Sequence, residues 1–193
     1  MSTRMTDIPS DKECINLLWE AGCKKRVVVH CATVRAVAEV IAAGIPGADM
    51  DVVIAGALLH DIGRSVDHSI MHAYLGAQIA EKKGLPKCLV EIIRKHTGAG
   101  LDDEDVREMG LPPGDYMPAT LEEKIVAHAD NMVSDNRVVS YRHSVDKLMF
   151  KGAERGALRV EMLHKELSNL FGRDLDTIID EIGEYPKLKH VKP

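Results

Sequence analysis

The chain has 193 residues, of which 45% are hydrophobic, 28% are charged and only 4% are aromatic. This size suits one globular domain over residues 1–193, and a core of small aliphatic side chains favours closely packed helices. The 30 Asp and Glu outnumber the 25 Lys and Arg, which gives a net charge of −5. Since proteins that bind nucleic acid usually carry a basic surface, we expect no nucleic-acid partner.

The cysteines and the N-terminal segment indicate a reducing compartment. Cys14, Cys23, Cys31 and Cys88 form no CxxC pair and no disulfide framework, so they are expected to be reduced and mostly buried. The first residues, MSTRMTDIPSDKE, lack the apolar stretch of a secretory signal. No segment approaches the roughly 18 continuous apolar residues of a membrane span. These features predict a cytoplasmic protein without a membrane partner.

Apolar periodicity and capping residues predict an all-α fold. Ser10 with Glu13, and Thr120 with Glu123, are capping-box pairs that start helices. The segment from Asp51 to His60 is apolar nearly all round, which places it at the centre of the molecule. No strand alternation, phosphate loop or internal repeat is present. The predicted helices cover residues 10–22, 25–43, 51–60, 70–83, 86–96, 102–109, 121–134, 144–150, 155–170 and 174–183.

The central predicted helix ends in the sequence LLHDIGR, residues 58–64, where His60 is followed directly by Asp61. Neighbouring side chains on a helix point about 100° apart, so the two converge only if the helix ends there. Gly63 allows a left-handed turn that brings Asp61 beside His60. The pair is therefore a candidate metal site. The alternative is a histidine that caps a buried helix and an aspartate in an ordinary turn.

Further histidines and one aspartate fall on the apolar faces of other predicted helices. Each alone would more often be an ordinary core residue, but every buried imidazole or carboxylate needs a partner. A divalent cation would satisfy all of them together, and mixed imidazole and carboxylate ligands suit transition metals better than calcium. Six ligands exceed what one tetrahedral ion uses, whereas two ions that share a carboxylate account for the number. The candidates are His30, His60, Asp61, His72, His96 and Asp130.

The order His30, His60-Asp61, Asp130 resembles the H…HD…D signature of the HD-domain superfamily of metal-dependent phosphohydrolases, in its HDIG form. HAYLGA at 72–77 and KHTGAG at 95–100 are similar to the two additional histidine motifs of HD proteins that hold two metals. The segments HDIGRSVDHSIMHAYLGA and TLEEKIVAHADNM look most like a small group of largely uncharacterised HDIG proteins from archaea. The resemblance covers about residues 25–135, and a helical extension follows over about 140–185.

This resemblance implies an all-α HD core with two divalent transition-metal ions, which could be iron, manganese, zinc, cobalt or nickel. One ion would be held by His30, His60, Asp61 and Asp130, and the other by Asp61, His72 and His96. The implied activity is hydrolysis of a phosphomonoester or phosphoanhydride of a nucleotide or similar small phosphorylated metabolite by a metal-bridged hydroxide. Two alternatives are a mononuclear HD nucleotidase and a non-catalytic nucleotide-binding regulator.

Three side chains beside the ligand positions are candidates for catalysis, together with the bridging Asp61. Arg64 and Lys95 could each contact a phosphate, although a solvated charge is the simpler interpretation of each. His68 could act as a general acid, or could be an ordinary polar residue of its loop.

The remaining histidines are not expected to be ligands. His128 precedes Asp130 by two positions, so on a helix it points about 160° away, by the 3.6-residue period. His143, His164 and His190 belong to the charged C-terminal tail and are expected on the surface. The tail carries no chemical motif, and it either covers the core or forms a homodimer.

Overall fold

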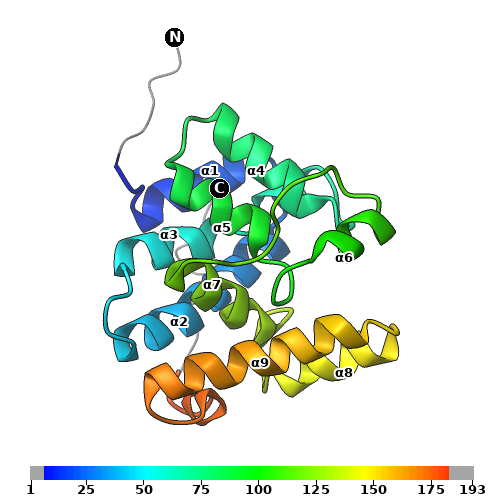
Figure 1. Cartoon of the computed structure of the whole chain (residues 1–193). Helices are drawn as coiled ribbons and strands as arrows, with labels where there is room; N and C mark the ends of the chain where they lie inside the picture. Colours follow the sequence, from blue (N-terminus) through cyan, green and yellow to red (C-terminus); the bar gives the residue numbers. More distant parts are fainter. Residues whose placement is uncertain (1–6, 183–193) are drawn as a thin grey trace.

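The computed structural model of the chain describes residues 7–182. Within that range the predicted all-α architecture is confirmed, and the observed helices lie close to the predicted ones (Figure 1). Both predicted capping boxes are formed, by Ser10 with Glu13 and by Thr120 with Glu123. The helices are α1 (Asp11–Glu20), α2 (Lys25–Gly44), α3 (Met50–Leu59), α4 (His72–Lys82), α5 (Lys87–Lys95), α6 (Asp103–Glu108), α7 (Leu121–Asn131), α8 (Arg142–Phe150) and α9 (Glu154–Phe171), with 3₁₀ turns η1 (Ile62–Ser65) and η2 (Leu175–Ile178).

Two segments differ from the prediction. The helix predicted to run to 134 ends at Asn131, and the strands β1 (Val133–Ser134) and β2 (Arg137–Val138) form an antiparallel hairpin. Its turn contains Asp135 with a positive φ of 56°, a conformation that tight hairpin turns require. In place of the helix predicted over 174–183, the described part of that segment contains only η2, and residue 183 lies outside the described residues.

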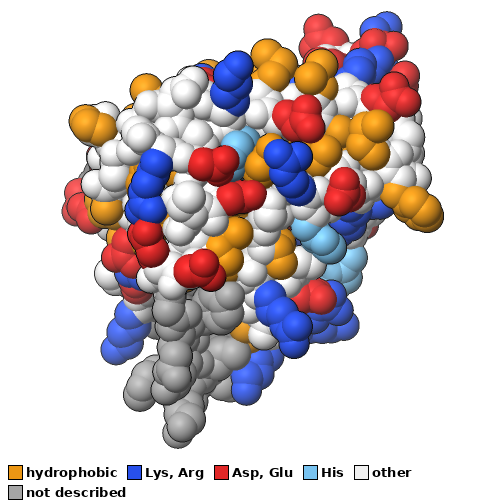
Figure 2. Space-filling model, turned by 90° about the horizontal axis from the view of Figure 1, so that it is seen from below, with side chains coloured by type: hydrophobic (Ala, Val, Ile, Leu, Met, Phe, Trp, Pro, Cys, Tyr) orange, Lys and Arg blue, Asp and Glu red, His pale blue; other side chains and the backbone are white. Residues whose placement is uncertain are grey.

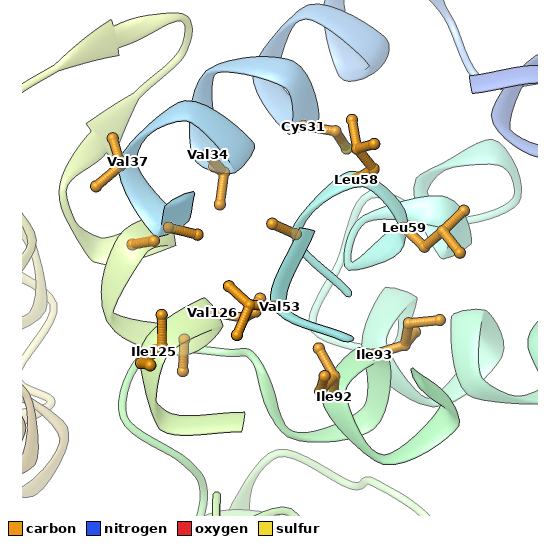
Figure 3. Packing of buried hydrophobic residues seen from close by; sticks show 14 of the residues in the cluster. Cys31, Val34, Val37, Val53, Leu58, Leu59, Ile92, Ile93, Ile125 and Val126 are labelled. Carbon is orange, nitrogen blue, oxygen red and sulfur yellow. The ribbon is translucent and has the colours of Figure 1, made fainter. Parts of the chain in front are cut away.

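Helix α3 lies at the centre of the main core, where it packs against α1, α2, α5 and α7. Seven of its ten residues are buried, which confirms that it is apolar nearly all round. Figure 3 shows Val53, Leu58 and Leu59 of α3 among side chains from α2, α5 and α7. Because α3 is enclosed along its length, the residues that follow it, His60 and Asp61, lie deep in the molecule.

Helix α2 is long and apolar enough to cross a membrane by length and composition alone. In this fold it is a core helix, since ten of its twenty residues are buried, among them Val34, Val37 and Ile41. Its apolar side chains therefore have a place inside the protein.

The C-terminal helices cover one side of the core. Val160, Leu163 and Leu167 of α9 belong to the same buried cluster as α3 and α7, as expected for a tail that covers the core. The outer faces of α8 and α9 expose some large apolar residues, most of all Phe150. The face seen from below in Figure 2 accordingly has hydrophobic side chains among charged ones of both signs.

Three of the four thiols are buried, and Cys88 is exposed. Burial raises the pKa of Cys14 to about 12 and that of Cys23 to about 11. These thiols are free and remain protonated, as predicted.

A close backbone contact joins η1 to α4. A methyl group on Gly63 would collide with the carbonyl oxygen of His72 and would lie 2.6 Å from the amide nitrogen of Gly76. Gly63 is not among the glycines with positive φ, so the predicted left-handed turn at this position is wrong. Its lack of a side chain serves instead to let the two segments touch, which sets His72 beside Asp61.

We predict opposite effects for two Gly→Ala substitutions. Gly63→Ala should lower the free energy of unfolding by about 2–3 kcal/mol, because the methyl group meets backbone that cannot move independently. A methyl group on Gly156, inside α9, would lie 3.7 Å from the side chain of Leu148, an ordinary contact. Gly156→Ala should therefore raise the free energy of unfolding by about 0.5–1 kcal/mol, because Ala has a higher helix propensity than Gly. Urea unfolding of both variants is the measurement. Equal midpoints would show that the close contact has no energetic importance.

Candidate metal centre

The centre is built around the place where α3 ends. The helix stops at Leu59, His60 is its capping residue, and Asp61 leaves helical geometry with φ −98° and ψ 15°. Both side chains are almost completely buried. Because the helix ends here, the side chains of His60 and Asp61 face the same space. A metal site at this dipeptide requires that arrangement.

Four histidines lie around this space, and each uses Nδ1 in the same way. A carbonyl oxygen can only accept, so each Nδ1 carries the proton and, in the neutral ring, Nε2 is left as a lone pair. The Nδ1 to oxygen pairs are His30 with Asp135 at 2.7 Å, His60 with Ala57 at 2.7 Å, His72 with Ser69 at 2.5 Å and His96 with Ile93 at 2.7 Å. Carbonyl partners of this kind are typical of histidines that bind metals.

The four Nε2 atoms point into one space together with two carboxylates. The Nε2 atoms of His72 and His96 are 3.1 Å apart, a separation at which two lone pairs repel each other. Asp130 Oδ1 lies 2.9 Å from His30 Nε2 and 3.6 Å from His60 Nε2. The arrangement therefore needs positive charge between its members.

Asp61 lies between two groups of donors. Its Oδ1 is 3.2 Å from His72 Nε2 and 3.4 Å from His96 Nε2. Its Oδ2 is 3.7 Å from the Nε2 atoms of both His30 and His60. One carboxylate thus presents one oxygen to each pair of histidines.

These distances fit the coordination of divalent cations. Ligand atoms about 2.0–2.2 Å from an ion lie about 3–3.5 Å from one another in tetrahedral or octahedral geometry. His60 Nε2 and Asp61 Oδ1 are buried and have no hydrogen-bond partner, which is costly unless an ion contacts them. The donors are imidazole and carboxylate groups, which suit transition metals. The six predicted ligands are thus brought together in one site.

The electrostatics of the site favour charged carboxylates. Burial alone would raise the pKa of Asp61, but the imidazoles of His60, His72 and His96 outweigh it and hold that pKa well below its usual range. Burial likewise opposes a charge on His30, yet its bond to Asp130 raises the pKa of His30 to about 9. The carboxylates are therefore in the ionised form that binds a metal.

Arg64 and His68 both line the pocket over these donors. Arg64 Nε donates to Asp61 Oδ2 at 2.5 Å, and its guanidinium also reaches the carbonyl oxygen of His68. Arg64 therefore holds the central carboxylate in place. The His68 ring is exposed and lines the same pocket.

The structure does not bring Lys95 to the site. Its ammonium group is buried and lies 3.3 Å from Glu91, 3.0 Å from Asp115 and 3.5 Å from Glu123. Three carboxylates neutralise this charge, and the residue does not line the pocket. Lys95 is thus a structural ion-pairing residue, although it precedes a predicted ligand in the sequence.

The pocket over the centre has a volume of about 750 Å³ and includes residues for which the sequence offered no signal. They come from the start of α2, from the hairpin and from α8, in a tail that carries no recognisable motif. These additional lining residues include Lys24, Arg26, Ser134, His143 and Lys147.

The other histidines divide between core and surface. His128 points away from the centre, as predicted, and its Nε2 lies 3.0 Å from Nδ1 of His164. Burial lowers the pKa of His128 to about 3. The prediction that His164 lies on the surface is wrong, because it is buried with its ring stacked on Tyr141. His143 is exposed, and His190 lies outside the described residues.

Three known proteins illustrate what the chain resembles. It is 44% identical to a tRNA (cytidine(56)-2'-O)-methyltransferase of Picrophilus torridus, over 91% of this chain and 51% of that protein. It is 40% identical to the uncharacterized protein MJ0778 of Methanocaldococcus jannaschii, over 77% and 91% of the two chains. It is 26% identical to ribonuclease Y of Clostridium kluyveri, over 88% of this chain and 34% of that protein. The chain thus spans about half the length of the first relative.

These relatives correct two predictions. The prediction of a nucleotide or small phosphorylated metabolite as the substrate is wrong, because two relatives that are 44% and 42% identical over 91% and 89% of this chain are named for the modification of tRNA. The expectation of no nucleic-acid partner is wrong for the same reason. The error arose because net charge is a sum over the whole surface and does not describe one pocket.

No solved structure matches the chain. The family model described as HD domain matches residues 27–135, which contain all six converging donors and the segment that joins them. This chain belongs to the HD domain family.

Proposed function

We propose that this chain is a metal-dependent phosphohydrolase that cleaves a phosphodiester bond of RNA, with tRNA as the first substrate to test. The observation that carries the proposal is the position of Asp61, whose two oxygens face two separate pairs of histidines. A bridging carboxylate between two donor sets is the arrangement that two-metal phosphoryl-transfer sites use.

The proposed ligands are His30, His60, Asp61 and Asp130 for one ion, and Asp61, His72 and His96 for the other. When bound, the ions would acidify a water molecule and neutralise charge on the phosphoryl oxygens. Arg64 keeps the Asp61 carboxylate oriented through the 2.5 Å contact.

We assign His68 as the residue that protonates the leaving oxygen of the ribose. Its ring lines the pocket and has no hydrogen-bond partner among residues 7–182. A histidine can give up a proton near neutral pH, and a ribose oxygen is a poor leaving group until it is protonated.

The names of the relatives support RNA as the substrate, since one is a tRNA-modifying enzyme and another is a ribonuclease. The chain matches half of the methyltransferase, so that protein's whole activity is not transferred to it. We further propose that the described residues act as one HD unit in the cytoplasm, where tRNA and reduced thiols occur together.

A second candidate function is favoured by the name of the Picrophilus protein. In that case the HD unit would bind tRNA to assist 2'-O-methylation without hydrolysing it. Binding of tRNA by a metal-replete protein that leaves the RNA intact would support this alternative.

The metal content gives the first test. We predict about two ions per chain after loading with Mn²⁺, about one in His72→Ala and less than one in Asp61→Ala, since Asp61 contacts both donor sets. Mn²⁺ at 100 times its Kd should stabilise the wild type by about 2.7 kcal/mol for each ion bound. Elemental analysis and thermal unfolding are the measurements.

Asp67→Ala is the matched control for this test. This carboxylate belongs to the same loop, but its hydrogen bonds go to Ser69 alone. The Asp67→Ala variant should bind as many ions as the wild type. If Asp61→Ala still held two ions, the bridging assignment would be wrong.

Hydrolysis gives the second test. With Mn²⁺, the wild type should cleave an oligoribonucleotide, and Asp61→Ala should not. His68→Gln should lower kcat on RNA by about 10²-fold, the size of a typical general-acid contribution. Its effect on bis(p-nitrophenyl) phosphate should be much smaller, because nitrophenolate leaves without a proton. Equal losses on both substrates would exclude His68 as the acid.

A further inference from the structure

The pocket over the metal centre is lined by basic side chains from two separate parts of the chain, which together form its basic rim. Lys24 and Arg26 come from the beginning of α2, and His143 and Lys147 come from α8. We propose that this rim is a second phosphate-binding subsite, which holds the RNA strand next to the phosphate at the metal centre. The inference rests on the proposed function, since it names how the same site would select an RNA strand.

The charge of the rim supports this assignment. The pocket is lined by four permanent cations, Lys24, Arg26, Arg64 and Lys147, and by three carboxylates. Two of those carboxylates, Asp61 and Asp130, belong to the metal centre, and the third, Asp135, is paired with Arg26 at 2.5 Å. Arg64 is in turn paired with Asp61 at 2.5 Å. The charges of Lys24 and Lys147 therefore have no counterpart among the residues that line the pocket.

Two of these cations are free to bind an anion. Lys24 and Lys147 are exposed, and neither forms an ion pair or a hydrogen bond through its side chain within residues 7–182. By contrast, the buried Lys95 is surrounded by three carboxylates. The free ammonium groups at the pocket mouth are therefore available for an anionic ligand.

The wall formed by α8 is fixed relative to the centre. Ser144 Oγ donates to the carbonyl oxygen of Asn131 at 2.9 Å, directly after Asp130. His143 Nε2 lies 3.2 Å from Ser134 Oγ in β1. His143 and Lys147 are four residues apart and so share a helix face. The α8 wall is thus held in place by the same segment that supplies a proposed metal ligand.

This arrangement suits a strand with several phosphates better than a single phosphate. A phosphate at the centre would be neutralised by the bound ions, whereas Lys24 and Lys147 gain contacts only from additional negative charges. Phosphate contacts from lysines position a nucleic acid without reading its sequence. The subsite therefore implies a preference for longer RNA strands and no preference for a particular base.

Binding and kinetics of Lys147→Gln test the subsite. With a fluorescein-labelled 12-nucleotide RNA, we expect fluorescence anisotropy to show Kd raised about fivefold, and the slope of log K against log salt reduced by about one phosphate contact. KM for RNA should rise more than kcat falls. Lys82→Gln, at the exposed end of α4, removes the same charge away from the pocket and should match the wild type.

The outcomes separate this inference from the proposed function. If Lys147→Gln and Lys82→Gln gave the same Kd and salt slope, the subsite would be wrong even if RNA were cleaved. If the wild type bound RNA through Lys147 but cleaved none, the subsite would stand and the hydrolase would not. Absence of RNA binding by the wild type would overturn both. Equal unfolding midpoints of the two variants would show that weaker RNA binding by Lys147→Gln does not arise from a less stable fold.

Discussion

The fold depends on one electrostatic constraint, the convergence of four imidazole nitrogens and two carboxylates at the end of α3. The Nε2 atoms of His72 and His96 are only 3.1 Å apart. Lone pairs and carboxylates this close to one another are stable only if positive charge lies among them. The donors come from α2, the end of α3, α4, the end of α5 and α7. The apolar packing around α3 brings these five segments together and holds the donors against their mutual repulsion.

Local backbone geometry orients three of the four imidazoles. His60, His72 and His96 each donate Nδ1–H to the carbonyl three residues earlier, which selects the tautomer with Nε2 free. His30 is different, because its partner is the carbonyl of Asp135, 105 positions away in the hairpin turn. That turn has a positive φ at Asp135, a conformation that Asp tolerates and that tight hairpin turns use. The hairpin thus joins the metal centre to the basic rim.

The distribution of charge shows why the net charge could not exclude a nucleic-acid partner. Much of the acidic excess is engaged far from the pocket, as where Arg155 and Arg159 of α9 pair with Asp102 and Asp105 around α6. Lys24 and Lys147, which line the pocket, form no ion pair within residues 7–182. A net charge of −5 is therefore compatible with a local surface that attracts a polyanion, because the field at a cleft depends on the nearest charges.

The sequence by itself determined most of the helices, the central position of α3, the six candidate donors and the family, because periodicity, capping and motif spacing are local properties of the chain. It did not determine which cations face the pocket. Lys95 stands beside a donor in sequence but is bound by three carboxylates, whereas Lys147 stands far from every donor and lines the pocket. Nor could it place His164, which is buried by packing against Tyr141 and α7. Those outcomes were decided by the tertiary structure, since they depend on how α8 and α9 return across α7, a contact between segments that no local pattern encodes.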